Sequence, residues 1–177
     1  MGIDVKTISQ SRLWGVDFPM IFVILGTQDK DFSRLLKEMD RLIDEKYITQ
    51  EVVVQAGTTK YHSKNMKIFD LIPMTEFKRF IGKADLIITH GGVGSIMNSL
   101  KKGKKVIAVP RLKKYGEHTN DHQLQIVKEF SRQSYVIPCL KMSQLGDCIE
   151  KSKTFQPKPY KSSNKKMLEL IEEVIQA

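Results

Sequence analysis

Short apolar runs alternate with stretches of helical periodicity along most of this chain. The runs span residues 21–25, 52–55, 67–72, 86–89, 106–109 and 135–138, and they are typical of strands buried in a parallel sheet. Between them, apolar residues recur at helical spacing over 32–43, 77–84, 94–102 and 120–130. This alternation predicts an α/β fold with right-handed crossovers and a doubly wound, mainly parallel, Rossmann-like sheet.

The same pattern divides the 177 residues into four predicted parts. Residues 1–19 show no clear period and are expected to be a leader or an upstream extension. Residues 20–154 form the predicted α/β domain, and residues 155–163, in a lysine-rich stretch with two prolines, predict a linker. Residues 164–177 predict an amphipathic helix whose broad apolar face packs on its own domain or on a partner.

Composition narrows the class of protein. The apolar runs are far shorter than the roughly 20 residues of a membrane-spanning helix, and the first nineteen residues lack the apolar segment of a secretory signal. We therefore expect a cytoplasmic protein in which Cys139 and Cys148 are free thiols. The formal net charge of +9 indicates an anionic partner: nucleotide phosphates, acidic lipid headgroups or nucleic acid. Nucleic acid is disfavoured because no aromatic residues are interleaved with a basic face.

The glycine-rich segment 89–95, Thr-His-Gly-Gly-Val-Gly-Ser, follows an apolar strand and opens the next predicted helix. Glycines let a backbone approach a phosphate, and the free N–H groups at a helix start attract anions. The candidate phosphate-binding residues are His90, Gly91, Gly92, Gly94 and Ser95. The alternative is a tight turn that needs glycine for steric reasons alone. The segment matches neither a Walker A loop nor a complete dinucleotide fingerprint.

Two further segments are candidates for the same site. Gly26 and Thr27 end the first strand, so they are expected on the same edge of the sheet as the glycine-rich segment. Asp121, His122 and Gln123 open a later helix and carry groups suited to bonding sugar hydroxyls. Their alternative interpretation is a capped helix start. Most of the basic residues at 111–114 are expected on a solvated face, with Arg111 and Lys113 as candidates to assist phosphate binding.

No metal is predicted. Asp29 and Asp31 match a loose Asp-x-Asp pattern, but they precede a helix, and Asp31 is placed to cap its first turn. His118 and His122 have the spacing of a helical zinc pair without an evident third ligand.

Taken together, His90 to Ser95, Val109-Pro110 and the run Asn-Asp-His-Gln at 120–123 resemble the C-terminal domain of glycosyltransferase family 28. The likeness is closest, over residues 20–133, to stand-alone versions of this domain. These are the soluble subunit of the two-part UDP-GlcNAc transferase of N-glycan synthesis and the bacterial PssE-like exopolysaccharide subunits. The resemblance implies the donor half of a GT-B enzyme, in which the glycine loops bind the nucleotide diphosphate and Asp121, His122 and Gln123 meet the sugar. Asn98 stands where many relatives carry a ribose-binding glutamate.

The resemblance also implies a function. We expect a donor-binding subunit, inactive alone, of an inverting, metal-independent enzyme that needs no cofactor. It would move a hexose from a UDP-sugar to a lipid-linked acceptor in capsule or exopolysaccharide synthesis. A membrane-anchored partner would bind the acceptor and recruit this chain to the inner face of the membrane. No general base is identified. The alternative is a non-catalytic nucleotide-sugar-binding module that regulates a transferase.

Overall fold

The computed structural model describes residues 19–161, 165, 168–169 and 171–172. In this part of the chain, all strands lie parallel in one sheet with the order β3-β2-β1-β4-β5-β6. The strands are β1 (Met20–Ile24), β2 (Glu51–Gln55), β3 (Lys67–Phe69), β4 (Leu86–Thr89), β5 (Lys105–Ala108) and β6 (Ile137–Pro138). The doubly wound sheet predicted from the alternating pattern is confirmed.

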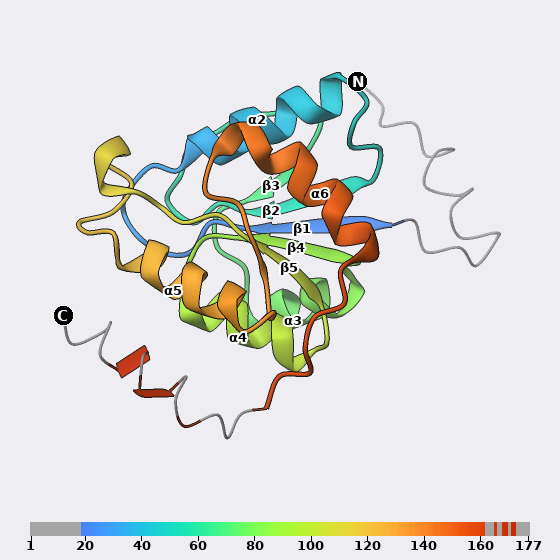
Figure 1. Cartoon of the computed structure of the whole chain (residues 1–177). Helices are drawn as coiled ribbons and strands as arrows, with labels where there is room; N and C mark the ends of the chain where they lie inside the picture. Colours follow the sequence, from blue (N-terminus) through green and yellow to red (C-terminus); the bar gives the residue numbers. More distant parts are fainter. Residues whose placement is uncertain (1–18, 162–164, 166–167, 170, 173–177) are drawn as a thin grey trace.

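Helices cover both faces of the sheet (Figure 1). One face carries α2 (Ser33–Asp44) and α6 (Leu145–Thr154), and the other carries α3 (Met74–Lys83), α4 (Val93–Lys101) and α5 (His122–Arg132). Two short 3-10 turns, Lys113–Tyr115 and Met142–Gln144, lie in the connections.

The two layers of core follow from the alternation of side chains along each strand. In β1, Ile21 and Val23 belong to the cluster under α2 and α6, whereas Phe22 and Ile24 belong to the cluster under α3, α4 and α5. Every residue of β1 is buried because this strand lies in the middle of the sheet. The central strands are therefore apolar on both faces, as parallel sheets require.

Helix α6 is absent from the sequence-based expectation. It buries Leu145, Cys148 and Ile149 and ends at Thr154, the residue before the predicted linker. Its three buried apolar residues lie among polar and basic ones, so the apolar period was weak. Cys139 and Cys148 are buried and unpaired by a disulfide.

The segment after α6 lies against the domain. The Lys158 N–H donates to the Ser134 carbonyl at 3.0 Å, and the Tyr160 ring packs edge-on against Tyr135 at 5.6 Å between centroids.

Of the predicted helix 164–177, the described residues 165, 168–169 and 171–172 are helical, and the side chain of Ile171 is buried in the core under α3 to α5. Met167, Leu170, Val174 and Ile175 of the predicted apolar face, and the predicted leader up to residue 18, lie outside the described residues. Within the described part, no helix is both long and apolar enough to cross a bilayer.

Candidate functional site

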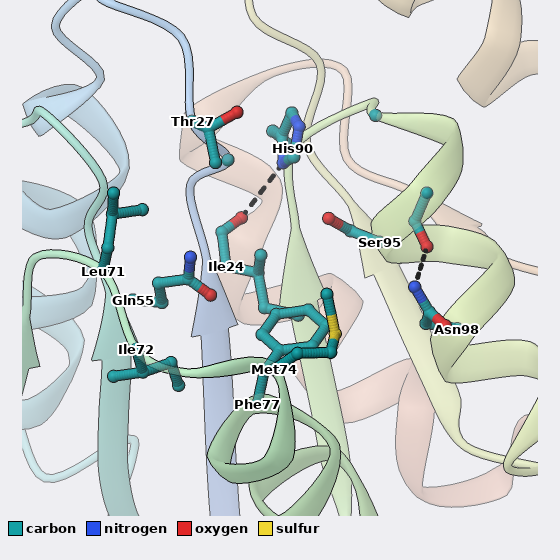
Figure 2. Close-up of a pocket in the computed structure, with 13 residues that line it drawn as sticks. Ile24, Thr27, Gln55, Leu71, Ile72, Met74, Phe77, His90, Ser95 and Asn98 are labelled. Atoms are coloured by element: carbon teal, nitrogen blue, oxygen red, sulfur yellow. Dashed lines mark hydrogen bonds between the residues drawn. The ribbon is translucent and has the colours of Figure 1, made fainter.

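The strand order places a cavity at one edge of the sheet. Chain connections leave β1 toward β2 on one side, whereas β4 continues toward β5 on the other, so the order reverses between β1 and β4. Ligands of open α/β sheets bind outside the carboxyl ends of the strands at such a reversal. Here the cavity has a volume of about 440 Å³ and is lined by Ile24, Gly26, Thr27, Gln55, Leu71, Ile72, Met74, Phe77, His90, Gly92, Gly94, Ser95 and Asn98 (Figure 2).

One end of the cavity is the amino-terminal end of α4. Gly92 precedes the helix, and no described side chain caps its first turn. The N–H groups of residues 93–95 come before the first intrahelical bond, from the Ile96 N–H to the Gly92 carbonyl. A Cβ added at Gly94 would meet no atom within 4 Å, so this residue leaves open space beside the helix start. Ser95 adds a hydroxyl, and together these groups make an anion-binding end.

His90 lies between the two glycine turns. A Cβ at Gly26 would stand 2.6 Å from the His90 Nε2 atom, and one at Gly92 would stand 2.2 Å from it. Gly26 also has a φ of +82°, which disfavours any other residue. The glycines at both positions therefore serve packing against the imidazole ring as well as any approach of a ligand.

The surroundings of His90 favour its neutral imidazole. Burial, and next the charge of Arg111, lower its pKa to about 4. Its Nδ1 atom lies 3.3 Å from the Ile24 carbonyl oxygen, which can only accept, so Nδ1 carries the proton (Figure 2). Nε2 then offers a lone pair. To donate to a phosphate, Nε2 would have to carry a proton, either because the ring takes up a second proton or because the proton moves from Nδ1 to Nε2.

The other end of the cavity is mostly apolar and was not expected from the sequence. Ile72, Met74 and Phe77 line it, together with Leu71, whose side chain is 63% exposed. Gln55 ends β2 there with its side chain 7% exposed, and its Oε1 atom has no hydrogen-bond partner among the described residues. The signal for Gln55 was a lone polar residue closing an apolar strand. An unpaired buried acceptor is costly unless a ligand satisfies it.

Asn98 lies beside the anion-binding end. Its Nδ2 group donates to the Gly94 carbonyl at 2.9 Å, which leaves the Oδ1 acceptor for a ligand. Gly91 does not line the cavity; a Cβ there would stand 2.7 Å from the Gln123 Cβ atom, so its glycine is required for packing against α5.

The predicted sugar-binding residues Asp121, His122 and Gln123 are not among the residues that line the cavity. The Asp121 carboxylate accepts from the Lys113 N–H at 2.9 Å, and Asn120 Oδ1 accepts from the His122 N–H at 3.1 Å. Gln123 is buried, and its Oε1 accepts from the Arg111 N–H at 3.0 Å. These contacts organise the loop before α5, and the sugar-binding role stays a prediction.

One member of each pair considered for metal binding, Asp31 and His118, has its side chain bonded to other protein groups. Asp31 Oδ2 accepts from the Ser33 hydroxyl at 2.7 Å and from the Ser33 N–H at 3.3 Å, one position earlier than a helix cap. His118 Nδ1 accepts from the Asn120 N–H at 3.2 Å. The described residues contain no group of three or more metal-ligating side chains.

Known proteins resemble this chain both in sequence and in fold. The model of the glycosyltransferase family 28 C-terminal domain matches residues 20–176. The UDP-N-acetylglucosamine transferase subunit ALG13 of Debaryomyces hansenii is 32% identical over 97 residues, covering 55% of this chain and 45% of that protein. The human ALG13 subunit is 37% identical over 62 residues, or 35% of this chain and 5% of that protein. This chain thus matches less than half the length of these relatives.

Solved structures share the fold. The NMR structure of ALG13 superposes with a TM-score of 0.57 and 20% identity, covering 90% of this chain and 98% of that chain. The crystal structure of Os79 from O. sativa in complex with UDP superposes with a TM-score of 0.58 and 13% identity, covering 96% of this chain and 38% of that one. The architecture is therefore that of the corresponding part of longer glycosyltransferases.

Proposed function

Because this chain belongs to the glycosyltransferase family 28 C-terminal domain family, we propose that it is the donor-binding subunit of a glycosyltransferase that uses a UDP-sugar. The observation that carries this proposal is the two-ended cavity at the sheet reversal, with a helix start at one end and an apolar wall with one buried amide at the other. A nucleoside diphosphate has the same division, anionic at one end and flat and weakly polar at the other.

Each part of a nucleoside diphosphate has a proposed place in the cavity. The diphosphate lies at the start of α4, where backbone N–H groups and the Ser95 hydroxyl donate to it. The base lies against Leu71, Ile72 and Phe77, and Gln55 bonds its polar edge. Asn98 Oδ1 is available to a ribose hydroxyl between them. Asp121, His122 and Gln123 are proposed to act near the sugar, with Gln123 acting through the backbone that it holds.

The chemistry proposed for this half is stabilisation of the leaving group. Negative charge grows on the diphosphate as the bond to the sugar breaks, and fixed N–H donors at a helix start stabilise that charge without reorganisation. A protonated His90 would add a donor at the same end. The transfer is proposed to be independent of metal, because the helix start supplies the charge stabilisation that a cation would otherwise provide. Inversion at the sugar carbon is proposed from the family resemblance alone.

A partner is proposed to supply the acceptor half. Support comes from the likeness to relatives named as transferase subunits. The proposed acceptor is lipid-linked, in capsule or exopolysaccharide synthesis, and the proposed partner is membrane-anchored and recruits this cytoplasmic chain to the inner face of the membrane. The net charge of +9 would favour an anionic leaflet, where each basic residue contributes about 1 kcal/mol.

The test combines binding with turnover. Purified protein is titrated with UDP, GDP and dTDP by calorimetry, and transfer from a panel of UDP-hexoses is then measured with membranes that contain the partner, with and without EDTA. UDP binding and EDTA-resistant transfer that requires both components support the proposal. Absence of binding by any nucleoside diphosphate at millimolar concentration refutes it. Binding without transfer from any donor refutes the catalytic role and indicates a regulatory module.

A further inference from the structure

Arg111 is the largest fully buried side chain of the described residues, with an exposed fraction of 0%. Most of the basic stretch 111–114 was expected on a solvated face, with Arg111 as a candidate to assist phosphate binding, but the Arg111 side chain is buried and is not among the residues that line the cavity. Its guanidinium lies 4.9 Å from the centre of the Phe32 ring and bonds to backbone carbonyls rather than to a carboxylate.

Two of those three carbonyls belong to the two ends of one loop. Arg111 Nη2 donates to the Leu25 carbonyl at 2.7 Å, and Nη1 donates to the Lys30 carbonyl at 2.7 Å. The loop between them contains Gly26 and Thr27, which line the cavity. A third bond, from Nη1 to the Glu117 carbonyl at 3.3 Å, ties the loop to the segment before α5. The guanidinium thus fixes the cavity wall from behind.

The charge of Arg111 is not cancelled by a contacting carboxylate. Glu117 and Asp31 are the nearby acids, but the two Glu117 oxygens accept from Arg34 at 2.6 and 2.9 Å, and Asp31 accepts from Ser33. The charge of Arg111 acts on the site, since it is the second cause, after burial, of the lowered pKa of His90.

Stability alone is a poor explanation for this arrangement. Burying a charge costs several kcal/mol, and apolar replacements of buried charges are often neutral or stabilising. In addition, the Arg111 Nε group is buried without a hydrogen-bond partner among the described residues. A costly, incompletely satisfied group directly behind a cavity wall indicates a role in the site.

We propose that Arg111 is a positioning residue of the donor site, which holds the Leu25–Lys30 loop in the shape that receives the nucleotide diphosphate without touching the ligand. This inference rests on the proposed function for the identity of the ligand. It adds to the site a residue that does not line the cavity. The Arg111 side chain has two effects: its guanidinium bonds two backbone carbonyls at once, and its positive charge acts on His90.

Two substitutions separate these effects. Arg111→Lys keeps the charge, but one ammonium lacks the planar fork that bonds both carbonyls. Arg111→Gln removes the charge and keeps a donor. Arg132 on α5, exposed and paired with Glu129, gives matched controls as Arg132→Lys and Arg132→Gln. Each variant is measured for UDP affinity by calorimetry, for amide hydrogen exchange, and for the pKa of His90 by NMR.

Arg111→Lys is expected to bind UDP roughly tenfold more weakly, which corresponds to about 1.4 kcal/mol. Its amide exchange should accelerate within residues 26–30 while the protein stays folded. Arg111→Gln should in addition raise the pKa of His90, which a purely structural role would not do. The Arg132 controls should leave all three measurements unchanged.

UDP affinity within twofold of the original together with unchanged exchange in the loop would overturn the proposal, as would failure of both Arg111 variants to fold. A wild-type protein that binds no UDP would instead refute the proposed function. In that case the loop exchange and the His90 pKa still decide whether Arg111 fixes the loop and acts on the site.

Discussion

Acid should destabilise this protein through His90 in particular. In the unfolded chain a histidine binds a proton near pH 6.5, whereas in the folded protein burial and the Arg111 charge lower the pKa of His90 to about 4. The unfolded state therefore binds more protons between these values, so stability is highest above pH 6.5 and falls as the pH falls toward 4. For these two pKa values, the linkage relation gives a loss of about 2 kcal/mol between pH 8 and pH 5.

The measurement is urea unfolding of the wild type and His90→Gln at pH 8 and pH 5. Other titrating groups act equally in both proteins, so the difference between the two pH-dependent losses isolates His90. The wild type should lose about 2 kcal/mol more than the variant, or roughly 4 to 8 °C in melting temperature. Equal losses in the two proteins would show that His90 titrates normally, and the neutral state assigned to it would be wrong.

Further predictions concern the ligand and the glycine turn. Saturation with UDP at ~100 times its dissociation constant should stabilise the protein by ~2.7 kcal/mol, seen as a rise in melting temperature of roughly 5 to 10 °C; no rise would argue against a donor site. Gly94→Val should abolish UDP binding with little change in stability, because the valine side chain would enter open space beside the helix start. Gly92→Ala should lower stability, because the added Cβ would press on the His90 ring. Thermal unfolding and calorimetry of both variants check this contrast. Gln123→Ala should lower the free energy of unfolding by about 1 to 3 kcal/mol, because it leaves the buried Arg111 N–H unpaired, and unchanged urea unfolding would contradict that role.

The parallel sheet was predictable because each strand is a short apolar run that can be recognised without knowing which strands lie next to it. The loop at 89–95 was also predictable, since a strand, glycines and a helix start are consecutive in the sequence. The apolar end of the cavity was not. Gln55, Leu71 and Phe77 come from separate segments, and only the strand order places them beside His90.

Arg111 shows a second reason for error. A stretch with three basic residues in four, 111–114, is typical of solvated surface, but here Phe32 and the carbonyls of distant segments surround the Arg111 guanidinium. Burial of such a group depends on tertiary contacts that no local pattern encodes. The bond from the Arg111 N–H to Gln123 Oε1 likewise depends on tertiary structure, and the sugar-binding role of Gln123 stays a prediction.

The most direct test of the donor-site assignment is an NMR titration of the isotope-labelled protein with UDP. The amide signals of Gly26, Thr27 and residues 90–95 should shift in a saturable manner, together with the side-chain amide signals of Gln55 and Asn98, while signals of α6 on the opposite face of the sheet stay in place. Saturable shifts confined to another surface, or none at millimolar UDP, would contradict the account.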